Sequence, residues 1–92
     1  MVEYSLQLDS VFGSLADSTR RDILRRVARS ELSVSEIAHS YDISLAAVSK
    51  HLKILEQAKL VIKRRRGKQQ LVQAAPKTLT DAEKYLEQYH QT

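Results

Sequence analysis

The most distinctive chemistry in this 92-residue chain is a run of basic side chains between residues 44 and 70. One carboxylate, Glu56, stands among eight cations there, which gives the segment a net charge of +7 in a chain of net charge +4. The cations are Lys50, Lys53, Lys59, Lys63, Arg64, Arg65, Arg66 and Lys68. One sign of charge gathered in one segment is the footprint expected for a polyanionic partner. On charge alone, a solvated face that only aids solubility is an equal alternative.

Other chemistries have little support in the sequence. The chain has no cysteine, which excludes disulfides and thiolate metal sites and fits a reducing compartment. Asp81, Glu83 and His90 lie in the last segment, and only one of them is a histidine. A transition metal usually needs at least three well-placed nitrogen or oxygen ligands, and this set does not provide them with the expected spacing. No nucleophile motif, glycine-rich phosphate loop or HExxH pattern occurs. We therefore expect no enzyme activity, no cofactor and no metal.

Length and hydropathy indicate how many domains the chain forms and where in the cell it acts. A chain of this length is expected to form a single small domain, residues 1–92. No apolar run approaches the ~18 residues of a membrane span, and the polar N-terminus does not resemble a signal peptide. These features predict a cytoplasmic protein that does not bind a membrane.

Two short helices joined by a tight turn are predicted to carry the first part of the basic segment. A capping-box pattern begins one helix at Ser33, and Ser44 caps a second helix over residues 45–58. The apolar stripe of the second helix is Leu45, Val48, Leu52 and Leu55. Its other face is small and polar, so it fits a DNA major groove about 12 Å wide. This pattern, about residues 33–58, is a helix-turn-helix.

The residues of this second helix that are candidates for DNA contact are not all equally well supported. They are Ser44, Ala46, Ala47, Ser49, Lys50, His51 and Lys53. Lysine donates to guanine O6 and N7, serine reaches base edges or phosphate, and alanine contacts a thymine methyl group. For Ser44, capping alone is the alternative. For His51, packing at the helix edge explains the residue as well as DNA contact does.

The pattern changes to that of a β-hairpin over residues 60–74. Apolar residues on both arms flank a turn in which Gly67 is free to take a positive φ. The basic residues around the turn are Lys63, Arg64, Arg65, Arg66 and Lys68. Such a tip is poor as a core element and suits contact with phosphates or the minor groove. A short targeting patch is the alternative.

Amphipathic helices are also predicted at both ends of the chain. One spans about residues 5–15, a second runs from Asp17 to about residue 29, and a last one, capped by Thr78, spans about 78–90. The first and last helices carry the apolar residues Leu8, Val11, Phe12, Leu79, Ala82, Tyr85, Leu86 and Tyr89. The last helix either packs on the first helix of its own chain or pairs with a partner's copy.

Several strings in this order resemble the ArsR/SmtB family of repressors. VFGSLADSTRRDIL at residues 11–24 is similar to the family opening VFxALADPTRRxIL, with Ser18 where proline is usual. Residues 35–38 and 44–55 (SEIA and SLAAVSKHLKIL) resemble the family pattern ELA…SxxxVSxHLKxL. Residues 58–61 match AGLV, with Lys59 in place of glycine, which leaves the helix-ending geometry there in doubt. The resemblance covers about residues 8–90.

The resemblance implies a mainly α fold with a small β-hairpin wing, that is, a winged helix-turn-helix with five helices. It implies a homodimer joined through the first and last helices, whose apolar residues above become the interface. It also implies repression through an inverted-repeat operator in double-stranded DNA. The last helix, with Tyr85 and Tyr89 spaced along it, most resembles that of the short, metal-independent members. The unknown effector is then a small molecule, a partner protein or the protein's own concentration. A winged-helix protein-interaction module without a DNA role is the alternative.

Overall fold

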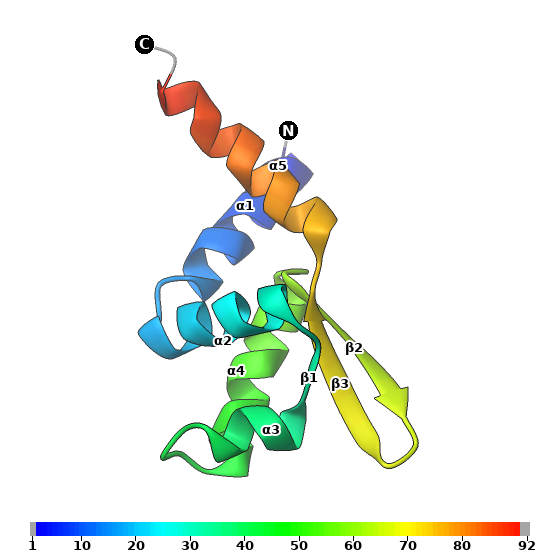
Figure 1. Cartoon of the computed structure of the whole chain (residues 1–92). Helices are drawn as coiled ribbons and strands as arrows, with labels where there is room; N and C mark the ends of the chain where they lie inside the picture. Colours follow the sequence, from blue (N-terminus) through cyan, green and yellow to red (C-terminus); the bar gives the residue numbers. More distant parts are fainter. Residues whose placement is uncertain (1, 91–92) are drawn as a thin grey trace.

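The computed structural model describes residues 2–90, with the side chains of residues 7–90, and has the architecture of a winged helix (Figure 1). In chain order the elements are α1 (Val2–Ser14), α2 (Ser18–Arg29), β1 (Leu32–Ser33), α3 (Val34–His39), α4 (Leu45–Gln57), β2 (Val61–Arg66), β3 (Gln69–Ala74), α5 (Pro76–Glu87) and the 3-10 turn η1 (Gln88–His90). Within this described range the five predicted helices and the hairpin are confirmed. None of these helices is both long and apolar enough to cross a bilayer.

The wing is a three-stranded antiparallel sheet in the order β1-β3-β2. The hairpin register joins Arg66 to Gln69, so Gly67 takes the first of two loop positions, with φ +62°. That positive φ is the one predicted from the sequence, and it favours glycine, which has no Cβ. The strand β1 pairs Leu32 with Val72 and was not predicted. Two residues are too few to show the alternation of a strand.

Side-chain caps set the starts of three helices as predicted. The Ser33 hydroxyl accepts a hydrogen bond from the Glu36 amide at 3.0 Å, and the Glu36 carboxylate accepts one from the Ser33 amide at 2.8 Å. Ser44 Oγ accepts from the Ala47 amide at 3.1 Å, and Asp17 caps α2 in the same way. Each bond satisfies an amide that the first helical turn leaves without a partner.

The start of α5 was predicted wrongly. The helix begins at Pro76, not after a Thr78 cap, and its N-cap residue Ala75 makes no side-chain capping bond. Proline suits the first helical position because its φ is already helical and its missing N–H is not needed there. The same proline also prevents β3 from continuing, since the strand stops at Ala74.

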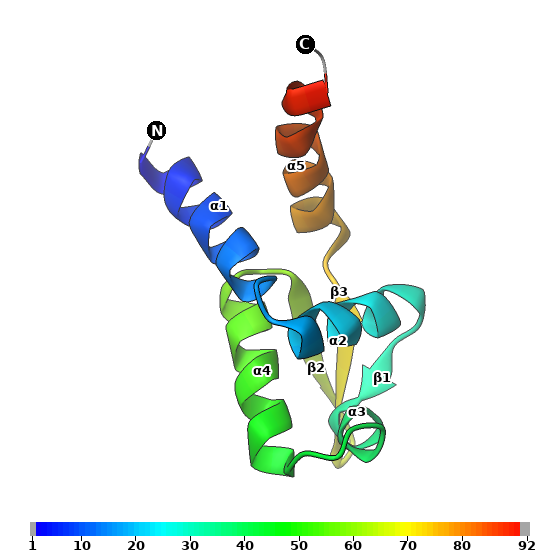
Figure 2. The same ribbon diagram turned by 90° about the vertical axis from the view of Figure 1, so that its left-hand side faces the viewer.

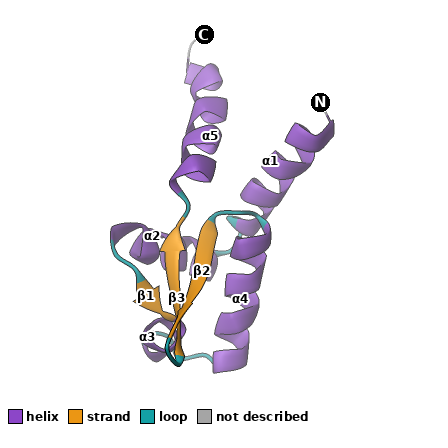
Figure 3. Ribbon diagram, turned by 90° about the vertical axis from the view of Figure 1, so that its right-hand side faces the viewer, coloured by secondary structure: helices purple, strands orange, loops and turns teal. Residues whose placement is uncertain are grey.

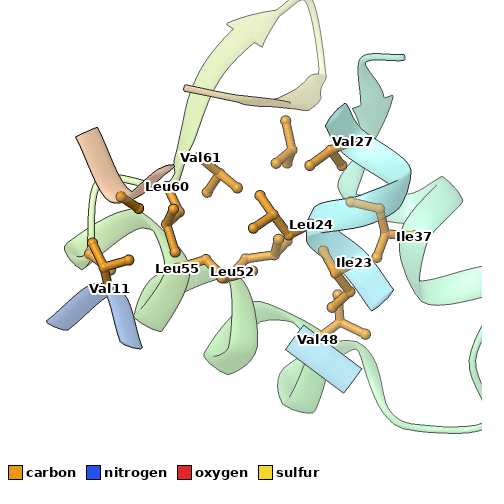
Figure 4. Packing of buried hydrophobic residues seen from close by; sticks show 13 residues of the cluster. Val11, Ile23, Leu24, Val27, Ile37, Val48, Leu52, Leu55, Leu60 and Val61 are labelled. Carbon is orange, nitrogen blue, oxygen red and sulfur yellow. The ribbon is translucent and has the colours of Figure 1, made fainter. Parts of the chain in front are cut away.

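The core lies where α4 meets α2, α3 and the sheet (Figure 4). Val48, Leu52 and Leu55 of α4 are fully buried, together with Ile23, Ile37 and Val72. The first residue of the predicted stripe is the exception, since Leu45 is 57% exposed. Its side chain lines a groove between α4 and the wing instead of the helix–helix contact.

The helices α1 and α5 stand together at the end of the molecule that carries both chain ends (Figure 2). Val11 of α1 and Ala82 of α5 join the core, and the Phe12 and Tyr85 rings lie 5.9 Å apart. The two helices then diverge toward their free ends. Within one protomer, therefore, α5 contacts its own α1 as far along as Tyr85, while Leu86 and Tyr89 stay 48% and 62% exposed.

Candidate nucleic-acid interface

The outer face of α4 is exposed, small and positively charged. Ala46, Lys50 and Lys53 lie on this face, opposite the buried stripe, and Ser49 lies beside them, also exposed. Neither lysine has a carboxylate within 4.0 Å among residues 7–90. Two unpaired ammonium groups on a helix with so little side-chain bulk suit close approach to a polyanion.

Two of the predicted contact residues lean away from this outer face. Ala47 and His51 are half-buried on the side of α4 that faces α2. Arg20 Nη1 lies 3.4 Å from His51 Nδ1, and the Arg20 Nε donates to the Ser14 carbonyl at 2.6 Å. Arg20 also lies 4.0 Å from the Asp17 carboxylate. The helix-edge packing considered for His51 is therefore present, and DNA contact by this residue stays a prediction.

A groove of about 240 Å³ separates α4 from the wing. Leu45 and Ser49 line its α4 side, and Lys63, Lys68 and Gln70 line its wing side. The α3 start closes a third side, where Ser35 is exposed. Val34, Leu45 and Leu52 contribute apolar groups to the groove, and Lys63 and Lys68 make it positively charged. The apolar spacing in the sequence had predicted that Leu45 lies in the core.

The five wing cations fall into two groups, which the sequence did not distinguish. Lys63 is 20% exposed and lies 3.2 Å from the Glu56 carboxylate of α4. Arg64 donates two hydrogen bonds to Glu31, at 2.9 and 3.0 Å, and this bidentate contact lowers the pKa of that carboxyl. Both residues are partly neutralised within the chain.

The other wing cations, Arg65, Arg66 and Lys68, lie at the exposed tip. None of the three has a carboxylate within 4.0 Å in the part of the chain with described side chains. The Arg65 Nε donates to the Gly67 carbonyl at 3.2 Å, which orders the turn while leaving the rest of the guanidinium free. The free charge of the wing is thus concentrated at its tip.

A polar cluster that sequence reasoning missed holds the turn between α3 and α4 against α2. The Tyr41 hydroxyl donates to Asp22 Oδ2 at 2.5 Å, and the Arg26 guanidinium lies 5.6 Å from the Tyr41 ring centroid. This hydrogen bond, followed by one from Arg25, lowers the pKa of Asp22. Burial, then the bond to Asp22, raises the pKa of Tyr41. These partners are about 20 residues apart, and no local pattern pairs them.

The start of α4, the short helix α3 and the wing tip lie at the same end of the molecule, away from the ends of α1 and α5 (Figures 1 and 3). In this chain α4 has a basic wing on one side and the capped helix α3 on the other. This arrangement defines the class of winged helix-turn-helix domains.

Comparison with known proteins agrees with this class. A family model described as a helix-turn-helix domain matches residues 15–64. The HTH-type transcriptional regulator Rv2034 of Mycobacterium tuberculosis is 43% identical over 68 residues, which are 74% of this chain and 64% of that protein. This chain therefore spans slightly less than two thirds of that relative's length.

Solved structures extend the likeness to nearly the whole chain. The crystal structure of an ArsR family transcriptional regulator superposes with a TM-score of 0.87 at 31% identity, covering 95% of this chain and 90% of that one. A homodimeric winged helix-turn-helix DNA-binding domain from Mycobacterium bovis, titled a possible ArsR-family regulator, gives 0.79 at 26% identity, covering 99% and 87%. The chain belongs to the ArsR/SmtB family of winged helix-turn-helix transcriptional regulators, a family of regulators and not of enzymes.

Proposed function

We propose that the chain is a homodimeric, sequence-specific DNA-binding repressor that acts in the cytoplasm. One observation carries the proposal, namely that the start of α4, the helix that bears Lys50 and Lys53, and the tip of the basic wing lie at the same end of the described molecule. In this proposal α4 enters the major groove, where Ser49 and Lys50 contact base edges and Lys53 contacts phosphate. Ser44, Ala46, Ala47 and His51 remain candidate contacts at its edges.

The wing supplies contacts that do not depend on sequence. Arg65, Arg66 and Lys68 at the exposed tip meet phosphates or the adjacent minor groove. Lys63 and Arg64 contribute less, because Glu56 and Glu31 already neutralise them. Of the five wing cations expected from the sequence to contact DNA, the main contacts are therefore the three around Gly67.

The dimer forms through α1 and α5. An open hollow of about 640 Å³ along α5 is lined by Leu79, Ala82 and Leu86, and the exposed Tyr89 continues this face. A second copy of the chain would remove the exposed Leu86 and Tyr89 from water, and the similar domain from Mycobacterium bovis is described as homodimeric. Leu8 and Phe12 of α1 then border the interface from the neighbouring helix, whereas Val11, which was also predicted there, is buried in the core of its own protomer.

The controlling signal is proposed to be something other than a transition metal. The support is the chain's lack of cysteine and a last helix with one histidine, His90, near its end. Adding zinc to the dimer on its operator tests this point. Release of the DNA at micromolar zinc would overturn it.

Footprinting on the DNA upstream of the coding region tests the main proposal. We expect protection of an inverted repeat whose half-sites lie about 34 Å apart, one helical turn. Sedimentation of the free protein should give the mass of a dimer. Binding that weakens steeply with salt but has no sequence preference would overturn the proposal, and a partner protein bound without DNA would favour the interaction module.

A further inference from the structure

Leu45 is the first residue of α4, the helix proposed to enter the major groove, and its side chain is solvent-exposed. It is 57% exposed, whereas Val48 and Leu52, the next members of its stripe, are fully buried. Ile43, in the turn just before α4, is 40% exposed. Neither Leu45 nor Ile43 belongs to the core cluster or packs against it. Two large apolar side chains thus lie exposed at the start of the helix that carries Lys50 and Lys53.

The surroundings of Leu45 combine apolar and positively charged groups, with Val34 and Leu52 lining the groove beside it. Ser49 lies one turn further along the same groove, and Lys63 and Lys68 line the opposite side. Lys50, on the adjacent face, has no carboxylate within 4.0 Å in the described part of the chain. An occupant that carries negative charge and offers a small apolar group next to polar ones fits this lining.

Duplex DNA meets this description. Its phosphates supply the charge, and the C5 methyl group of thymine is the apolar group displayed on the major-groove edge. The N-terminal residues of a recognition helix are the ones that reach base edges. Leu45 holds that position, while Ala46 on the outer face is too short to cover a methyl group to the same extent.

We infer that Leu45 is a specificity-determining residue that contacts the C5 methyl group of a thymine in each half-site. The inference rests on the proposed DNA-binding function and goes beyond it, because it names a residue and a base. It replaces the alanines as the main apolar contact to DNA. It also accounts for a leucine that leaves the core stripe at its first position.

The test uses deoxyuridine, which removes only the methyl group from a thymine. A duplex selected by the wild-type chain from a random library is remade with single thymines of each half-site replaced in turn. We expect one position at which this change weakens wild-type binding about fourfold, the ratio for one buried methyl group. At that position Leu45→Ala should bind the two duplexes equally.

Ile62→Ala is the matched control, because Ile62 is an exposed apolar residue on β2 that does not line the groove. It should keep the wild-type ratio, and thermal unfolding of both variants should show intact folds. A fourfold ratio that persists in Leu45→Ala overturns the inference, as does a wild-type protein that ignores every methyl group. A wild-type protein that selects no sequence overturns the proposed function itself, and this inference with it.

Discussion

Lys59 occupies a backbone conformation that favours glycine, and replacing it should stabilise the protein. It follows the last turn of α4 with φ +61°. Its amide donates to the Glu56 carbonyl at 2.9 Å and the Leu60 amide donates to the Leu55 carbonyl at 3.0 Å, the two bonds of a Schellman motif. The left-handed C′ position of this motif is the one that family members fill with glycine. The doubt raised by Lys59 is thus resolved, since the cap forms with lysine in it.

The size of the effect follows from two opposing contributions. A Cβ in the left-handed region costs about 1–2 kcal/mol. Glycine removes that cost but gives the unfolded chain more freedom, which takes back about 0.4–1 kcal/mol. For Lys59→Gly we expect the free energy of unfolding to rise by about 0.5–1 kcal/mol. In a chain of this length that corresponds to a Tm higher by roughly 3–6 °C.

Circular dichroism during thermal and urea unfolding measures the change. All variants are compared at one protein concentration, because dimer formation makes Tm depend on it. Lys59→Ala is the matched control, since it removes the ammonium group and keeps the Cβ. The reasoning is refuted if Lys59→Gly is no more stable than Lys59→Ala.

Three further predictions concern DNA contact and pH. Lys50→Ala should cost about 1–3 kcal/mol on the operator and relax base preference, as titration against cognate and scrambled duplexes measures; an equal loss on both would place Lys50 on phosphate. Arg65→Ala should lower the slope of log K against log salt by about 0.9, and Arg64→Ala by less, because Glu31 already neutralises Arg64. Equal slopes in anisotropy titrations would contradict this difference. Asp22 has a lowered pKa in the folded state, so its contribution is present above about pH 4 and is lost as pH falls through the folded value. Asp22→Asn should therefore destabilise at pH 7, and its gap to wild type in urea unfolding should narrow toward pH 3; a gap that widens in acid would be the wrong sign.

Most of the fold was predictable because its signals are local. Ser33, Ser44 and Asp17 cap helices through bonds that span only three residues, and a glycine in a basic turn fixes the hairpin. Errors arose where two local signals competed or where a signal was too short. The capping signal of Thr78 competes with that of Pro76, which begins α5 in the structure, and β1 has only two residues.

The candidate site was predicted as a set of residues but not as an arrangement. The sequence identified the cations of residues 44–70 and the face of α4, because charge and helical period are properties of the chain alone. It could not show that Glu31 pairs with Arg64 across the sheet, because 33 residues separate them.

The sequence by itself therefore determined the order of elements, their caps, the buried stripe from Val48 onward and the basic character of one segment. The tertiary structure decided which cations are left without an ion pair among the described residues, which edge of α4 is covered by α2 and where the buried stripe of α4 begins. The reason is that ion pairing and burial depend on what another element places opposite a residue. Leu45 is the clearest case, since its spacing matches the core and only the groove beside it leaves it exposed.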